Sequence, residues 1–82
     1  MYSVYFLKAK NNKIYVGVTS KNPAERLNEH NLGSNQFTKQ NKPFILIYYE
    51  QYHCLQDAML RERYYKTGVG RQIKALIVKY MS

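Results

Sequence analysis

The chain has 82 residues, which suffice for one small domain with a thin hydrophobic core. Its 13 lysines and arginines outnumber 5 aspartates and glutamates, and the resulting net charge of +8 favours a polyanionic partner such as nucleic acid. One cysteine excludes an internal disulfide, and two histidines with it are too few for a structural zinc site. The sequence shows neither a membrane-spanning apolar run nor a signal-peptide pattern, so we expect a cytoplasmic protein without a membrane partner.

Two aromatic segments, residues 2–8 and 13–19, predict a β-hairpin, because they are rich in Val, Ile, Tyr and Phe and flank Asn11-Asn12. The loop length decides which side chains share a face. A two-residue loop would separate the tyrosines and split the aliphatic set, so we expect an odd loop in which residue 9 faces residue 13. In that register one face carries Tyr5, Leu7, Tyr15 and Gly17, and the other carries Val4, Phe6, Ile14, Val16 and Val18.

A helix is predicted over residues 22–31. Asn22 can cap its start, Pro23 suits its first position, and Gly33 lies just past its end. The inward face is expected to carry Ala24, Leu27 and Asn31, with Arg26 and His30 stacked on the adjacent side.

The polar segment 33–42 is predicted to be an exposed loop that carries Lys39 and Lys42. A third strand follows over residues 44–51. It is almost continuously apolar, and strands of this kind are usually covered on both faces. We therefore expect helices on both sides of this strand.

A second helix is predicted over residues 55–66 and a last helix over residues 71–80. Glu62 interrupts the apolar face of the second helix. Burying an unpaired carboxylate costs several kcal/mol, so this position requires either an arginine or a metal ion. The expected inward residues are Leu55, Ala58, Met59, Glu62 and Tyr65 in the second helix, and Ile73, Leu76, Ile77 and Tyr80 in the last.

Five short motifs occur in order along residues 2–71. They are Val4-Tyr5-Phe6-Leu7, Tyr15-Val16-Gly17, Arg26 to His30-Asn31, Tyr48-Tyr49-Glu50, and Ala58 to Glu62 to Lys66. Each alone is weak, but together they resemble the small single-domain members of the GIY-YIG nuclease superfamily. Related domains occur in homing endonucleases, restriction enzymes and the incision subunits of nucleotide-excision repair. The resemblance implies one α+β domain over residues 1–82, with a three-stranded antiparallel sheet flanked by helices in the order β-β-α-β-α-α.

The same resemblance implies metal-dependent hydrolysis of DNA phosphodiester bonds. Tyr15 would activate water as general base with the support of Tyr5, Arg26 would bind the scissile phosphate, His30 would complete the catalytic set, and Glu62 would hold one Mg²⁺ or Mn²⁺ ion. These residue types suit the chemistry. Arginine offers a planar donor fork to phosphate oxygens, and a hard cation needs only one carboxylate if phosphate and water supply its other ligands.

Duplex or branched DNA is the expected partner, with Gly17, Lys39, Lys42, Lys66 and Arg71 as candidate contacts. A homodimer or a partner protein would supply sequence specificity. Other interpretations stay open: the tyrosines could be sheet wall, Gly17 a bulge or a close-packing site, Arg26 and His30 an exposed helix face, and Glu62 a structural partner of Arg26 or Arg61. The principal alternative function is a nucleic-acid binding module with weak or no catalysis.

Overall fold

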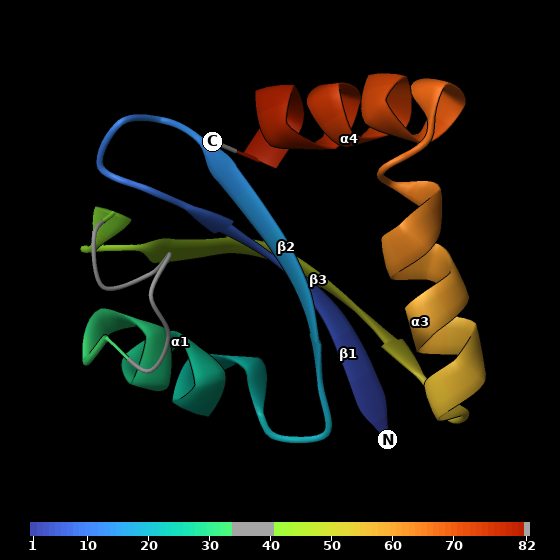
Figure 1. Cartoon of the computed structure of the whole chain (residues 1–82), viewed down its shortest axis with the longest axis horizontal. Helices are drawn as coiled ribbons and strands as arrows, with labels where there is room; N and C mark the ends of the chain where they lie inside the picture. The colour runs from blue at the N-terminus through green and yellow to red at the C-terminus, as the bar shows by residue number, and fades with distance from the viewer. Residues whose placement is uncertain (34–40, 82) are drawn as a thin grey trace.

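The computed structural model describes residues 1–33 and 41–81. Strands β1 (Tyr2–Lys8), β2 (Ile14–Thr19) and β3 (Ile45–Tyr52) form one antiparallel sheet in the order β2-β1-β3. Helix α1 (Pro23–Asn31) lies to the left of the sheet in Figure 1 and α3 (Leu55–Tyr64) to the right, with α4 (Gly68–Met81) across the top. The described residues therefore confirm the predicted α+β fold and its order β-β-α-β-α-α.

The hairpin has the predicted odd loop. The backbone N–H of Ala9 donates to the Lys13 carbonyl at 2.8 Å, and that of Asn12 donates back to Ala9 at 2.9 Å. Asn12 has φ 68°, a left-handed conformation that asparagine tolerates better than most residues. In the resulting register Tyr5 pairs with Gly17, and Tyr15 shares their face.

A β-bulge interrupts the pairing of β1 with β3. Phe6 pairs with Tyr48, whereas the next residue, Leu7, pairs with Leu46, so Ile47 is the extra residue. The bulge places Leu46 on one face of the sheet and Tyr48 on the other, and Glu50 lies on the same face as Tyr48. The bulge therefore explains how a strand without polar alternation supplies side chains to both faces of the sheet.

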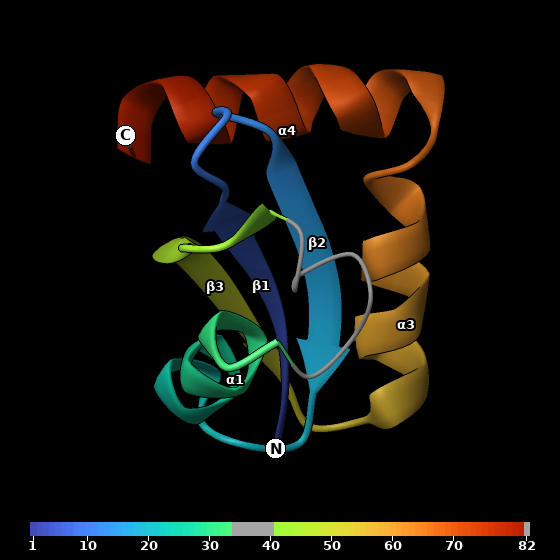
Figure 2. The ribbon, with the colours of Figure 1, turned by 60° about the vertical axis from the view of Figure 1, so that its left-hand side comes forward.

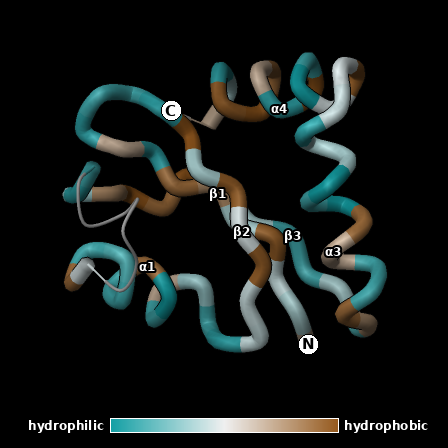
Figure 3. Tube along the Cα trace, viewed as in Figure 1, coloured by the Kyte–Doolittle hydropathy of each residue, from teal (hydrophilic) through white to brown (hydrophobic). Residues whose placement is uncertain are grey.

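Helices cover both faces of the sheet, as predicted from the third strand. Buried Tyr5 and Leu7 pack with Leu27 of α1, whereas Val4 and Phe6 pack against α3 and α4. Figure 2 shows α1 in front of the sheet, and Figure 3 shows apolar strands beside a hydrophilic hairpin tip. Coverage of β3 is incomplete, however. It is an edge strand, and its residues Ile45 and Tyr49 are 57% and 50% exposed.

The predicted inward faces of the helices are partly wrong. Helix α1 buries Pro23 and His30 rather than Ala24. Among the described residues of α3, Ala58 alone is buried, because this helix meets the sheet through a small residue and through polar contacts described below. Helix α4 packs through Ile73, Ile77 and Val78, a face rotated from the expected one. The predicted inward residues that prove exposed are Ala24, Leu55, Met59, Leu76 and Tyr80.

Within residues 1–33 and 41–81, no helix has the length and apolar character needed to cross a membrane.

Candidate active site

The site is built around Tyr5, which is 1% exposed in the middle of the sheet. Its ring extends over Gly17, the residue opposite it on β2. A methyl group added to Gly17 would lie 2.4 Å from the Tyr5 hydroxyl oxygen, so only glycine leaves room for this tyrosine. The close-packing interpretation of Gly17 is therefore confirmed, and its contact with nucleic acid stays a prediction.

His30 is fully buried on α1 and points at Tyr5, on the side of the helix that also carries Arg26, as expected. Its Nε2 forms a 2.9 Å hydrogen bond with the Tyr5 hydroxyl, and its ring lies 5.0 Å from that of Tyr15. Its Nδ1 has no hydrogen-bond partner among the described residues. Burial, and then the nearby charge of Arg26, lower the pKa of His30, so the imidazole is neutral at neutral pH.

Tyr5 and Tyr15 form a pair with different surroundings. Their ring centroids are 6.4 Å apart, and Tyr15 is only half-buried. Burial raises the pKa of Tyr5 to about 12; a hydrogen bond from Arg26 opposes this shift, and the charges of Tyr15 and Glu62 add to it. Tyr5 thus favours the neutral phenol. Tyr15 is the tyrosine of the pair that water can reach.

Arg26, on α1, also reaches the Tyr5 hydroxyl to which His30 is hydrogen-bonded, and it forms an ion pair with Glu29. Its Nη1 donates to Glu29 at 2.6 Å, and Glu29 is shared with Lys21. The hydrogen bond to Glu29, followed by the one to Tyr5, raises the pKa of Arg26 although burial opposes the shift. Sequence reasoning missed Glu29, although its i,i+3 spacing from Arg26 is a usable signal.

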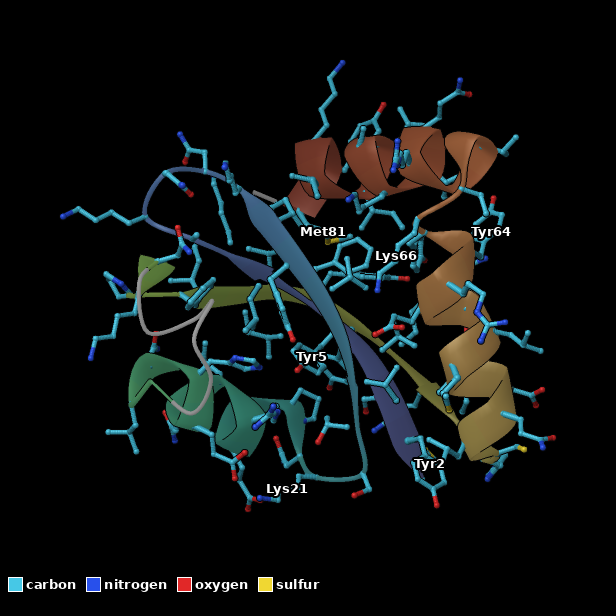
Figure 4. All side chains as sticks on the ribbon, viewed as in Figure 1. Tyr2, Tyr5, Lys21, Tyr64, Lys66 and Met81 are labelled. Atoms are coloured by element: carbon cyan, nitrogen blue, oxygen red, sulfur yellow. The ribbon has the colours of Figure 1, made fainter. Side chains whose placement is uncertain are left out.

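Glu62 lies on α3 with its side chain 28% exposed, so it is half-buried rather than sealed in a core. It forms an ion pair with Lys66, at 3.6 Å and one helical turn away. The alternative pairings are wrong, because Arg26 pairs with Glu29 and Arg61 with Glu50. The Glu62 charge nevertheless acts on Tyr5 across the sheet edge, since it contributes to the raised pKa of that tyrosine. Figure 4 shows Tyr5 between α1 and α3, with Lys66 on the α3 side.

The donor set around Glu62 suits a weakly held, substrate-dependent cation. Among the described residues, no group of three or more His, Cys, Asp or Glu side chains could hold a metal ion. A single accessible carboxylate fits Mg²⁺ or Mn²⁺ if water and substrate phosphate complete the shell, which is how Mg²⁺ is usually bound.

The residues predicted to contact phosphate are less closely grouped in the structure than Tyr5, Tyr15, Arg26 and His30 are. Exposed Lys42 lines a hollow of about 360 Å³ with Lys10, Asn11 and Asn41. Arg71 is exposed on α4, and Lys66 is 61% exposed while paired with Glu62. Lys39 lies outside the described residues. The roles of these cations stay predictions.

Comparison with known proteins agrees with this geometry. A family model described as the GIY-YIG catalytic domain matches residues 1–74. The chain belongs to the GIY-YIG family. It is 36% identical to UPF0213 protein SH2523 of Staphylococcus haemolyticus over 93% of this chain and 92% of that protein. UPF0213 proteins of Staphylococcus aureus are 34% identical over the same shares.

A solved member of this group has the same fold. The solution NMR structure of the UPF0213 protein BH0048 from Bacillus halodurans matches with a TM-score of 0.59 at 25% identity. The match covers 100% of this chain and 88% of that one. Membership in this family supports assignment of the chain to a nuclease class, and the names of these relatives state no activity.

Proposed function

We propose that this protein is a metal-dependent endonuclease that hydrolyses DNA phosphodiester bonds. The observation that carries the proposal is the meeting of Tyr5, His30 and Arg26 at one hydroxyl, with Tyr15 beside them and the charge of Glu62 acting on the same point. These side chains come from two strands and two helices. A pure wall of tyrosines would not require an arginine, a neutral histidine and a carboxylate there.

In the proposed reaction a water molecule attacks phosphorus while the bond to the leaving oxygen breaks, and that oxygen takes up a proton from solvent. The Tyr15 phenolate accepts the proton of that water, because this ring is accessible whereas Tyr5 is enclosed. A tyrosine acts as a base only as its phenolate, which a nearby cation such as Arg26 would favour. Tyr5 and His30 fix the geometry beside Tyr15 through their mutual hydrogen bond.

Arg26 would bind the non-bridging oxygens of the scissile phosphate, on which negative charge accumulates in the transition state. A guanidinium has five N–H donors, so its contacts with Glu29 and Tyr5 leave donors for phosphate. One Mg²⁺ or Mn²⁺ ion, held by Glu62, would supply further charge neutralisation at phosphate oxygen.

The decisive experiment incubates the protein with plasmid, single-stranded DNA, branched DNA and RNA, in Mg²⁺, in Mn²⁺ and in chelator. We expect metal-dependent cleavage of duplex or branched DNA. Glu62→Gln should abolish cleavage and leave DNA binding nearly intact, whereas Arg26→Ala should reduce both. Glu25→Gln is the matched control, because Glu25 is an exposed carboxylate on α1.

Stability separates the catalytic role of Glu62 from a structural one. Its partner Lys66 is largely exposed, so losing the pair should cost only about 0.3–0.5 kcal/mol. A Gln variant that melts near the wild-type temperature and does not cleave supports the proposal. Full cleavage by the Gln variant would rule out the metal-ligand role.

The second candidate function is nucleic-acid binding without hydrolysis. The net charge of +8 favours it, because electrostatic binding to phosphates requires no catalytic residue. Salt-sensitive DNA binding without cleavage of any substrate in either metal would establish it in place of the nuclease. In both cases a homodimer or a partner protein would supply specificity.

A further inference from the structure

Glu50 is the centre of a polar cluster on the face of the sheet opposite Tyr5. Its carboxylate, with the side chain 11% exposed, accepts hydrogen bonds from Tyr48 at 2.8 Å, Tyr52 at 2.6 Å, the Nε of Arg61 at 3.1 Å, and Tyr65. Burial alone would raise the pKa of Glu50, but these four hydrogen bonds lower it. A buried carboxylate with four donors is ionised and held in one orientation.

Two of the four donors connect this carboxylate to α3. Arg61 lies in the helix and Tyr65 caps its end. The Arg61 guanidinium also stacks over the rings of Tyr64 and Tyr65, at 4.9 and 4.7 Å from their centroids. Arg61 is therefore fixed both by its ion pair with β3 and by its packing on the end of its own helix.

Apolar contacts alone hold α3 weakly. Among its described residues Ala58 alone is buried, and the larger Leu55, Met59 and Leu60 are 42%, 45% and 60% exposed. Its larger apolar contacts lie at its C-terminal end, where Tyr64 packs against the core and the cap residue Tyr65 is buried. The Arg61–Glu50 pair adds a polar contact that fixes one point of the helix circumference to the sheet.

Glu62 directly follows Arg61 on this helix. Successive side chains on an α-helix point about 100° apart, so fixing the direction of Arg61 also fixes that of Glu62. This direction brings the Glu62 charge near Tyr5, whereas Arg61 reaches Glu50. The Glu50 cluster and the Tyr5 site, on opposite faces of the sheet, are thus linked through adjacent residues of α3.

The geometry points to Glu50 as a positioning residue that, through Arg61, sets the direction in which Glu62 presents its carboxylate to a divalent cation. This inference rests on the proposed function, since it takes Glu62 as the metal ligand. It gives the Tyr48-Tyr49-Glu50 motif a role without contact with DNA. Positioning partners of metal ligands typically change metal affinity by 10- to 100-fold when they are removed.

The test compares two arginines of one helix. Arg61→Gln breaks the link to Glu50, whereas Arg63→Gln removes the same charge from an exposed position of the same helix. Glu50→Gln breaks the link from the other side with the opposite change of charge. Mn²⁺ is titrated into each ¹⁵N-labelled protein, and broadening of amide signals around Glu62 gives an apparent Kd without any need for activity. Melting temperatures are measured in parallel.

We expect Arg61→Gln and Glu50→Gln to raise the Kd for Mn²⁺ about tenfold, with Arg63→Gln within twofold of wild type. Unchanged affinity in both link variants, even with lower melting temperatures, would reduce the cluster to a structural role and overturn the inference. An equal effect of Arg63→Gln would show a general charge effect and overturn it too. If Glu50→Gln does not fold, the comparison of the two arginine variants still decides.

Failure of the proposed function has a different signature. Wild-type protein that shows no broadening near Glu62 would remove the metal role of Glu62, and this inference with it. Normal wild-type binding with unchanged link variants would remove the inference alone.

Discussion

Replacing Gly17 with alanine adds one carbon atom to the site, at a point where Tyr5 leaves no room for it. The added methyl carbon would lie 2.4 Å from the hydroxyl oxygen of Tyr5 and 2.6 Å from its Cζ, where ordinary contacts begin at 3.4 Å. The ring would have to retreat by about 1 Å. It has little room to do so, because Tyr5 is 1% exposed and hydrogen-bonded to buried His30.

The cost follows from two contributions. Overpacking a filled site costs about 1–3 kcal/mol, and loss of the Tyr5–His30 hydrogen bond adds about 1 kcal/mol. We therefore expect Gly17→Ala to lower the free energy of unfolding by about 2–4 kcal/mol. For a domain of this size each kcal/mol corresponds to about 4–8 °C, so the melting temperature should fall by about 10 °C or more.

Urea unfolding measures this cost, and Gly68→Ala is the matched control. A methyl at Gly68 would meet nothing within 4 Å, and the position opens α4, where alanine is favoured over glycine. The control should be as stable as wild type or slightly more stable. If Gly17→Ala lost less than about 0.5 kcal/mol, the conclusion that glycine makes room for Tyr5 would be refuted.

Three further outcomes are expected. DNA binding should weaken steeply with salt, with a log–log slope near −3 to −4 if about four phosphates are neutralised; a flat response would contradict the charge argument. Glu29→Gln should strengthen DNA binding at low salt more than Glu25→Gln does, because Glu29 alone of the two neutralises Arg26; equal effects in a filter-binding assay would contradict a specific role. Stability should fall on both sides of neutrality. Because the pKa of His30 is lowered, its contribution to folding stability is present above pH 6.5 and is lost as pH falls below that value. Because the pKa of Tyr5 is raised, its contribution to folding stability is lost as pH rises from 10 to about 12. Urea midpoints that stay constant across both pH ranges would contradict these shifts.

Local sequence signals predicted the half of the site that lies on the hairpin and α1. The odd loop set the register of β2 on β1, and that register alone puts Tyr5, Tyr15 and Gly17 on one face. Asn22 caps α1 as expected, with its side chain accepting the N–H of Ala24 at 2.8 Å. These features depend on neighbours close in sequence, so pattern and turn chemistry suffice to find them.

Helix faces were harder to predict, because apolar spacing identifies only apolar contacts. In α3 the pattern predicts that Leu55 and Met59 face inward, yet both are exposed, and the helix meets the sheet through Ala58 and the ion pair of Arg61 with Glu50. His30 shows the opposite difference. Apolar spacing does not predict that this polar side chain is buried, and the structure buries it because Tyr5 supplies its hydrogen-bond partner.

The bulge in β3 explains why periodicity could not place Glu50 on the face of the sheet opposite Leu46. Strict alternation from Leu46 would put Leu46, Tyr48 and Glu50 on one face, but Leu46 pairs with Leu7 and Tyr48 with Phe6, whose side chains point to opposite faces. The extra residue, Ile47, thus lets Leu46 pack beneath α1 while Glu50 faces α3. Without it, either the apolar contact of α1 or the carboxylate that binds Arg61 would lie on the wrong side of the sheet. A local irregularity between two strands distant in sequence therefore allows this small sheet to support α1 with Arg26 on one face and the helix of Glu62 on the other.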